Sequence, residues 1–343
     1  MLAVGSNARR DAAYTSEIVA SAYAYPSDLV DNSEYMRRCR FLPSSSAETL
    51  ALETRMKTRR WCLPQENTAT LCENLVERLL TRHGQVVSEI DAVVVASGTT
   101  MTMAHPSDPK NVAYADLAPL VLRQLGRPNA LGLDIKACYC AGFLRGLQVV
   151  DGLLANPNYR SVLLLAAEQG SRFATAASNR SSFCYIVSDA AGGMVLRRGA
   201  PRARVGVLDY CGYTDVAKLD WVGIGEDAAS IIMLGSRAAE ATLGMLLEMA
   251  HTLLSRNGLT MREVDWLLPI QTHAGLLEEL CRKLECPTEK MLWNGDVNGF
   301  SGSASIPSCF AEKVEQGRIQ KGQLLLSLAV GAGMNCAGAL YYA

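Results

Sequence analysis

The sequence of 343 residues lacks an excess of charge of either sign, because 33 lysines and arginines nearly balance 34 aspartates and glutamates. This balance excludes a strong overall field that would attract nucleic acid or an anionic membrane. The sequence also lacks an apolar run of about 18 residues, the length that a membrane-spanning helix needs, and residues 1–10 lack the apolar segment of a signal peptide. We therefore expect a cytoplasmic protein that binds neither nucleic acid nor a membrane.

Aromatic residues are scarce, at 6% of the chain, and charged residues reach only 20%, whereas hydrophobic residues make up 49% and glycine contributes 28 residues. This profile excludes extended disorder and is typical of a packed α/β protein with close contacts between helices. At this length one hydrophobic core is seldom sufficient, so we expect two domains or two lobes that share an interface.

The eleven cysteines have neither the spacing of a metal site nor the density of a secreted disulfide framework. Most of them lie within apolar runs, where a reduced thiol packs like a small hydrophobic side chain. We therefore predict reduced core thiols and no metal site.

Short runs rich in β-forming residues alternate with longer segments of helical periodicity. In the first half, strands are predicted at 92–96, 161–166 and 183–187, and helices at 110–125 and 141–154. Such alternation predicts a mostly parallel sheet covered by helices.

The second half of the sequence repeats this order. An acidic lead-in followed by a buried strand occurs twice, at 89–95 and at 263–268, which indicates an internal duplication. We predict two related lobes, residues 1–198 and residues 199–343, that pack closely because no low-complexity linker separates them. The elements predicted for the second lobe are strands at 205–210, 264–269 and 323–327 and helices at 236–256 and 275–284.

Residues 134–147 combine the features of a nucleophilic cysteine. A short apolar run ends at Cys140, and a helical pattern begins immediately after it. A thiol in the first turn of a helix faces unpaired N–H groups and the positive end of the helix dipole, which favour the thiolate. Ala141 and Gly142 leave space above the sulfur. We therefore predict that Cys140 is a primed nucleophile within reach of a substrate carbonyl.

Several segments, in the same order along the chain, resemble the ketoacyl-acyl-carrier-protein synthase III branch of the thiolase fold. Residues 134–143 are similar to its nucleophile motif, although one extra residue separates Asp134 from Cys140 and makes Cys138 a rival nucleophile. The Ala-Gly-Phe that follows Cys140 favours Cys140. Further segments resemble the family's Gly-Asp-Gly-Ala-Gly strand turn (187–196), its last helix-to-strand junction (316–326) and its glycine-rich loop beside the nucleophile (331–338).

The resemblance implies a thiolase-like α/β fold, in which two pseudo-repeated lobes contain mixed sheets and layered helices, usually in a homodimer. It also implies that the cysteine accepts an acyl group from the pantetheine thioester of coenzyme A or of an acyl carrier protein, without a permanently bound cofactor. Stabilisation of the oxyanion would then fall to backbone N–H groups at Cys140 and Ala332.

Two positions depart from the family pattern. Ile270 occupies the place of a histidine that normally follows the strand-ending proline, and Phe300 occupies the place of an asparagine. In the family this histidine and asparagine both donate to the enolate oxygen that forms when a malonyl thioester loses carbon dioxide. One donor of this kind contributes about 3 kcal/mol to catalysis, so we expect decarboxylative condensation to be impaired. Acyl transfer needs only a nucleophile, a base and the backbone oxyanion donors.

We therefore predict an acyltransferase in polyketide or other specialised metabolism, which loads an acyl group onto Cys140 and passes it to a second acceptor. His273, three residues after Ile270, is the predicted base, oriented by Asp296 or by Asn298. The alternative for His273 is a purely structural role, in which it caps the helix that follows it. The predicted walls of the acyl pocket are His105, Ile270 and Phe300.

Two other functions remain open at this point. The first is decarboxylative carbon–carbon condensation with a rearranged His273 and Asn298. The second is an inactive structural partner of a homologous condensing enzyme. The absence of the histidine and the asparagine at the family positions supports this alternative. The sequence leaves open the acyl donor, the acceptor, the bond formed and the choice between coenzyme A and a carrier protein.

Overall fold

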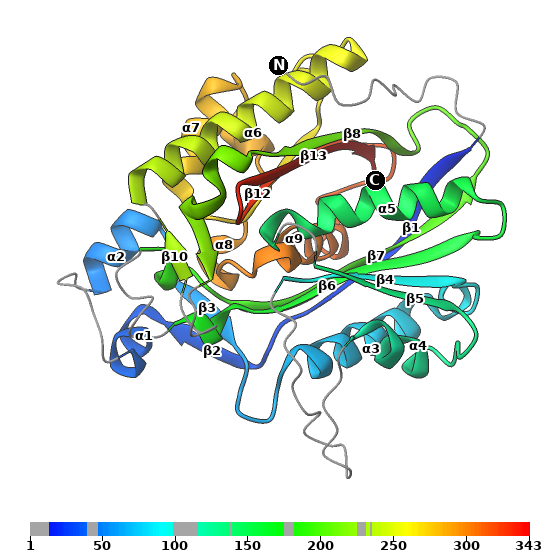
Figure 1. The fold of residues 1–343 in the computed structure, drawn as a ribbon, viewed down its shortest axis with the longest axis horizontal. Coiled ribbons are helices and arrows are strands. Elements are labelled where there is room, and N and C mark those ends of the chain that lie inside the picture. The colour runs from blue at the N-terminus through cyan, green and yellow to red at the C-terminus, as the bar shows by residue number, and fades with distance from the viewer. Residues whose placement is uncertain are drawn as a thin grey trace.

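The structure is a computed structural model that describes residues 14–39, 47–98, 116–136, 139–174, 182–224, 231–233 and 235–343. Two sheets lie roughly one above the other, with helices outside each sheet and helices between them (Figure 1). The predicted α/β fold with layered helices and mixed sheets is therefore confirmed.

The first sheet has the order β1-β7-β6-β4-β5. Three neighbours, β6, β4 and β5, are parallel, whereas β7 and β1 add antiparallel strands at the other edge. The parallel strand β4 reads Ala-Val-Val-Val-Ala and is buried along its length, as expected for a strand with both faces covered. The strands are β1 (Thr15–Ala24), β4 (Ala92–Ala96), β5 (Leu131–Ile135), β6 (Ser161–Gln169) and β7 (Asp189–Gly199).

The second sheet repeats the pattern of the first. Its order is β11-β12-β13-β8, with β11 and β12 parallel and the other two pairings antiparallel. The series β4, β6, β7 and β1 therefore has the same directions as β11, β12, β13 and β8, and β5 is an extra edge strand. This correspondence confirms the predicted pseudo-repeat. The strands are β8 (Gly206–Thr214), β11 (Trp266–Pro269), β12 (Leu324–Gly331) and β13 (Asn335–Tyr342).

The helices divide among three layers. One hydrophobic cluster joins α3 and α4 to the outer face of the first sheet, while a larger cluster includes α5, α9, α6 and both sheets. Helix α5 contacts β4 and β6 on one side and β12 and β13 on the other, so it lies between the sheets. The helices are α3 (Thr68–Val87), α4 (Ala118–Gln124), α5 (Gly142–Ala155), α6 (Gly235–Asn257), α7 (Ala274–Lys283) and α9 (Ser305–Glu315).

Smaller elements surround one end of the two sheets. Strands β2 and β3 form an antiparallel pair, and so do β9 and β10. The remaining elements are β2 (Asp28–Asp31), α1 (Asn32–Arg38), α2 (Ala47–Thr54), β3 (Thr58–Trp61), β9 (Val222–Ile224), β10 (Ile231–Met233) and α8 (Gly295–Asn298).

Most predicted elements are confirmed, including the helices at 141–154 (α5) and 236–256 (α6), but the strand at 183–187 is wrong. Ser182–Tyr185 forms a 3₁₀ turn, and Val187 makes only an isolated bridge to Phe300. The aromatic residues that suggested a strand pack in a turn instead, because tertiary contacts override β propensity. The mostly parallel sheet is also wrong, since both sheets are mixed.

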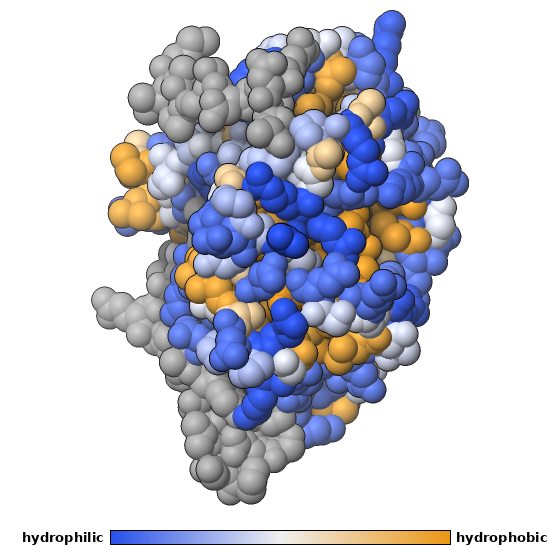
Figure 2. Space-filling model, turned by 90° about the vertical axis from the view of Figure 1, so that its right-hand side faces the viewer, coloured by the Kyte–Doolittle hydropathy of each residue, from blue (hydrophilic) through white to orange (hydrophobic). Residues whose placement is uncertain are grey.

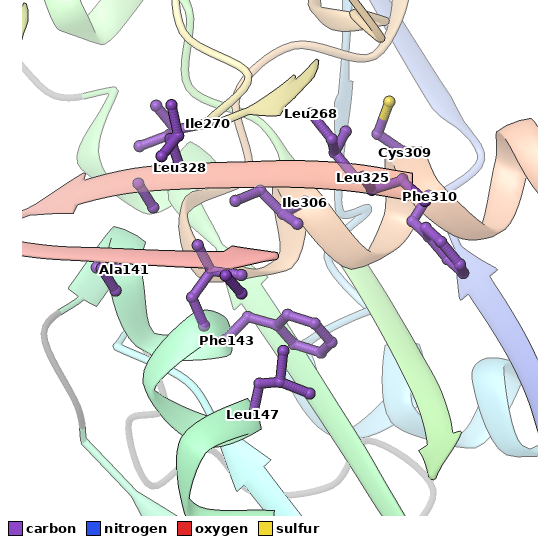
Figure 3. Packing of buried hydrophobic residues seen from close by; sticks show 14 of the residues in the cluster. Ala141, Phe143, Leu147, Leu268, Ile270, Ile306, Cys309, Phe310, Leu325 and Leu328 are labelled. Atoms are coloured by element: carbon purple, nitrogen blue, oxygen red, sulfur yellow. The ribbon is translucent and has the colours of Figure 1, made fainter. Parts of the chain in front are cut away.

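The predicted boundary between residues 198 and 199 stays a prediction. The chain leaves the first sheet at Gly199 and enters the second at Gly206. The lobes nevertheless share one hydrophobic core, to which α5 and α9 contribute buried side chains such as Phe143 and Phe310 (Figure 3). We therefore expect the two lobes to unfold together.

Hydrophilic side chains cover most of the face shown in Figure 2, with smaller hydrophobic patches between them. Opposite charges on the surface pair locally, as Arg78 and Arg82 do with Glu315. Among the residues that the structure describes, no helix combines the length and the apolar character needed to cross a bilayer.

Candidate active site

A cavity of about 430 Å³ opens between the start of α5 and the turn that joins β12 to β13. It brings together five of the predicted site residues: Cys140, Ile270, His273, Phe300 and Ala332. Most of its other described lining is apolar, including Phe173, Phe183, Ile186, Val187, Val222, Leu276, Val330 and Met334. Such a cavity suits an apolar group whose reactive end lies beside the thiol.

Cys140 lies in a tight corner between a strand and a helix. It is the middle residue of a 3₁₀ turn, Tyr139–Ala141, and α5 begins at Gly142. Tyr139 has a φ of 45°, a value that is uncommon for a residue with a side chain. Gly98 makes this corner possible, because a Cβ atom there would lie 2.7 Å from Cδ1 of Tyr139. The corner presents a half-buried thiol to the cavity.

The thiol is not primed in the way that the sequence suggested. Burial raises the pKa of Cys140 to about 12, and the negative charge of Glu168 adds to the rise. A helix N-terminus stabilises an anion by about 1 kcal/mol, which corresponds to less than one pKa unit. Because α5 begins two residues after the sulfur-bearing residue, its dipole is too weak to offset burial. Cys140 is therefore protonated at neutral pH, and the expectation of a thiolate is corrected.

His273 caps α7, as the structural alternative for this residue predicts. Its Nδ1 atom accepts a hydrogen bond of 3.4 Å from the backbone N–H of Leu276. Burial lowers the pKa of the imidazole, which favours the neutral ring. In a neutral ring with Nδ1 as acceptor, the proton resides on Nε2. We assign that tautomer from this hydrogen bond. His273 can therefore donate to an oxygen in the cavity, but it is poorly placed to accept a proton.

Asp296 and Asn298 do not line the cavity, and both bond elsewhere. The Oδ2 atom of Asp296 pairs with Nζ of Lys57 at 3.3 Å. The Nδ2 group of Asn298 donates to Oε2 of Glu312 at 3.4 Å. The cause of the lowered pKa of His273 is burial. The prediction that either residue orients His273 thus lacks support in the geometry, and we do not propose it further.

Ile270 and Phe300 place apolar walls at the two positions that depart from the family pattern. Both side chains are buried, at 5% and 3% exposure. Ile270 lies beside Leu328 of β12 (Figure 3). The backbone N–H of Ile270 donates to the carbonyl of Leu328 at 2.8 Å. The ring of Phe300 packs edge-on against Phe183, with 5.3 Å between the centroids. Neither wall can donate a hydrogen bond from its side chain.

Ala332 belongs to the turn between β12 and β13. The next two residues, Gly333 and Met334, both have positive φ values, of 74° and 29°. The Nδ2 group of Asn335 donates to the carbonyl of Ala332 at 2.7 Å and so fixes the orientation of that peptide. The turn therefore holds the Ala332 backbone at the edge of the cavity that contains Cys140.

Glu168 is a cavity residue that the sequence reasoning missed. It lies in β6, is only 1% exposed and accepts hydrogen bonds at Oε1 from the N–H of Gly98 at 2.7 Å and from the hydroxyl of Ser303. Its charge raises the pKa of both Cys140 and Tyr139. The available signal was an acidic residue near the end of an otherwise apolar strand, because buried carboxylates are rare unless they have partners.

Two other predictions fall outside the described residues. His105, a predicted wall of the acyl pocket, and Cys138, the rival nucleophile, both lie there. Within the described part of the chain, no cluster of three or more histidine, cysteine or acidic side chains could hold a metal ion.

Comparisons with known proteins agree with this arrangement. The family model described as 3-oxoacyl-[acyl-carrier-protein] synthase III matches residues 133–215, and the model of its C-terminal part matches residues 254–343. Beta-ketoacyl-[acyl-carrier-protein] synthase III from Granulibacter bethesdensis is 28% identical over 333 residues, which cover 94% of this chain and 98% of that protein.

Two solved structures share the fold. The 3-oxoacyl-(acyl carrier protein) synthase III from Pseudomonas aeruginosa has a TM-score of 0.83 at 21% identity and covers 96% of this chain and 98% of its own. OleA from Xanthomonas campestris, in a variant with bound lauric acid and lauroyl-CoA, has a TM-score of 0.81 at 14% identity and covers 95% of this chain and 98% of its own. The chain belongs to the 3-oxoacyl-[acyl-carrier-protein] synthase III family of thiolase-fold condensing enzymes and is an acyltransferase.

Proposed function

We propose that this enzyme takes an acyl group from a pantetheine thioester onto Cys140 and passes it to a second acceptor, without decarboxylating a malonyl thioester. The observation that carries the proposal is the pair of buried apolar side chains, Ile270 and Phe300, in the same cavity as the thiol. They stand where the family has the histidine and asparagine that stabilise an enolate.

The first half of the reaction needs an acyl chain beside the thiol and donors around the carbonyl oxygen. The apolar walls of the cavity favour a hydrocarbon chain or an aromatic acyl group. Backbone N–H groups of Cys140 and Ala332 would donate to the oxyanion as the sulfur attacks. OleA, which has the same fold, has been crystallised with lauroyl-CoA, and this supports an acyl thioester as the donor.

The second half transfers the acyl group from Cys140 to an acceptor that carries a hydroxyl, amine, thiol or carbon nucleophile. Each missing enolate donor lowers a rate by about a hundredfold or more. With both positions apolar, an acceptor that needs no enolate is favoured over malonyl thioester. We assign the product to polyketide or other specialised metabolism, where such transfers modify a preformed acceptor.

Decarboxylative condensation is the second candidate, and one observation favours it. His273 lines the cavity, and its neutral imidazole carries the proton on Nε2, so one enolate donor could be supplied from a new position. The names of the relatives also fit this activity. An inactive partner is not proposed, since the thiol has an open cavity beside it and the chain belongs to a family of enzymes.

The assembly and location that we propose follow from family membership. We infer a homodimer, in which β5, an edge strand of the described sheet whose first residue Leu131 is 37% exposed, would meet a second copy. Sedimentation velocity would test this. We place the enzyme in the cytoplasm, because the described cysteines are reduced thiols, which are usual in a reducing compartment. The enzyme would act on acyl-CoA or acyl carrier protein and needs no permanently bound cofactor.

Intact-protein mass spectrometry after incubation with a panel of acyl-CoA and acyl-carrier thioesters tests the proposal. We expect the mass to rise by one acyl group for at least one apolar donor. Cys140→Ala should remove the adduct entirely, whereas Cys211→Ala, a half-buried cysteine outside the cavity, should keep it. An adduct that survives in Cys140→Ala would show that the nucleophile lies elsewhere.

A further inference from the structure

We propose that the carboxylate of Glu168 is the base that takes the proton from Cys140 during acylation and from the acceptor during transfer. The inference rests on the proposed function and names the residue that completes its chemistry. A protonated thiol attacks poorly, so the site needs a group that accepts this proton as the sulfur–carbon bond forms.

Three described side chains of the cavity, besides Cys140 itself, carry a titratable group: Tyr139, Glu168 and His273. Burial and the charges of Glu168 and Cys140 raise the pKa of Tyr139, so its phenol stays protonated and cannot accept a proton at neutral pH. His273 already uses Nδ1 to cap α7 through Leu276. Glu168 is the one of the three that remains as an acceptor.

The surroundings of Glu168 hold its carboxyl group in one orientation. The backbone N–H of Gly98, which follows β4, and the hydroxyl of Ser303, which precedes α9, both donate to the same oxygen, Oε1. Gly302 packs directly against the group, because a Cβ atom there would lie 3.5 Å from Cδ of Glu168. The carboxyl group of Glu168 is therefore held where it lines the same cavity as the thiol.

Two further observations connect this carboxylate with the sulfur. Glu168 and Cys140 line the same cavity, and Gly98, which binds Glu168, also packs against Tyr139, the neighbour of Cys140. The charge of Glu168 is felt at both Tyr139 and Cys140. The charge of a carboxylate in the same cavity disfavours a standing thiolate, and the same carboxylate can accept the proton as the sulfur attacks.

The proton balance closes over both halves of the reaction. As the sulfur of Cys140 attacks the thioester carbonyl, its proton moves to Glu168. Collapse of the tetrahedral intermediate expels the pantetheine thiolate, which takes that proton and leaves as a thiol. The acceptor then gives its proton to Glu168 while it attacks the acyl group. Collapse expels the thiolate of Cys140, which recovers the proton, and Glu168 ends as a carboxylate.

Glu168→Gln separates a base from a purely structural residue, because glutamine keeps the oxygen that Gly98 and Ser303 bind. Two rates are compared: acylation of Cys140 by the best thioester of the panel, and alkylation of Cys140 by iodoacetamide at pH 8. The matched control is Glu312→Gln, a carboxylate bound by Asn294 and Asn298 outside the cavity, which should change neither rate.

We expect Glu168→Gln to slow acylation about a hundredfold, the usual contribution of a general base. We expect it to speed alkylation about tenfold, because removal of a like charge lowers the pKa of the thiol. Unchanged acylation would overturn the proposal, and so would a loss of both rates together, since that result marks a residue that only maintains the site. If the wild type accepts no acyl group from any thioester, the proposed function itself fails, and this outcome is visible before any variant is examined.

Discussion

The two lobes contribute unlike halves to one cavity. The first lobe supplies reactive polar groups, Cys140 and Glu168, at the ends of buried elements. The second lobe repeats the same strand directions but supplies Ile270 and Phe300, which are apolar, and His273, whose Nδ1 atom caps a helix. The comparison teaches that two lobes with the same strand directions can place very different side chains in one cavity.

The largest change in activity should come from restoring the histidine and the asparagine in the second lobe. Ile270→His combined with Phe300→Asn would place two donors at the positions where the family has them. We expect the release of carbon dioxide from malonyl-CoA to rise by about a hundredfold or more, because each donor contributes on that scale. Radiolabelled malonyl-CoA measures the effect.

The control for that experiment is the same double variant with Cys140→Ala, which keeps both new donors but cannot hold an acyl group. Circular dichroism should first show that the double variant folds. A folded double variant that releases no more carbon dioxide than the wild type would mean that the two positions do not determine the chemistry.

The thiol of Cys140, in the first lobe, can be examined through the pH dependence of its alkylation. The pKa of Cys140 is raised to about 12, so the thiolate fraction below that pH grows about tenfold with each pH unit. We expect the rate with iodoacetamide to climb steadily through pH 10, whereas a model cysteine peptide levels off near its pKa of about 8.5. A plateau of the Cys140 rate below pH 9 would show that the thiol is primed after all.

His273, in the second lobe, caps α7 and carries an imidazole N–H, and two variants separate the helix cap from the hydrogen-bond donor. Asparagine is a good N-cap residue, so His273→Asn should leave the free energy of unfolding nearly unchanged but lose the imidazole N–H. His273→Ala should lower the free energy of unfolding by about 1 kcal/mol through loss of the cap. Urea denaturation and the acylation rate measure the two effects.

If His273 acts as a donor, both variants should slow acyl transfer to a similar extent. A rate that falls only in His273→Ala would instead assign the residue to the helix cap alone.

The smallest effect is expected at Asp296, which the structure separates from the chemistry. Its partner Lys57 has a side chain that is 72% exposed, and exposed ion pairs contribute at most about 1 kcal/mol. Asp296→Asn should leave the acylation rate within twofold of the wild type. A large loss in rate would return Asp296 to the active site.

Much of the fold could be predicted because it depends on local patterns. The buried run of β4 and the helical periodicity of α5 and α6 are visible in sequence, and so is the cysteine at the strand-to-helix corner. The turn at Ser182–Tyr185 was missed because the packing of Phe183 on Phe300, far apart in sequence, decides it.

The lining of the site was predictable where residue identity carries the information, as at Cys140, Ile270 and Phe300, whose chemical roles stay predictions. The site was not predictable where electrostatics depends on burial. A helix start suggested a thiolate, but desolvation and the nearby charge of Glu168 act in the other direction. The bonds of Asp296 to Lys57 and of Asn298 to Glu312 likewise depend on contacts between distant segments.

The most direct test of the central claim follows two products in one preparation. Wild-type enzyme is loaded with its best acyl thioester, malonyl-CoA is added, and the acyl adduct on Cys140 and the released carbon dioxide are measured over the same time course. We predict that the adduct persists and that carbon dioxide stays at the level of Cys140→Ala. Loss of the adduct in step with release of carbon dioxide would contradict the account and identify a condensing enzyme.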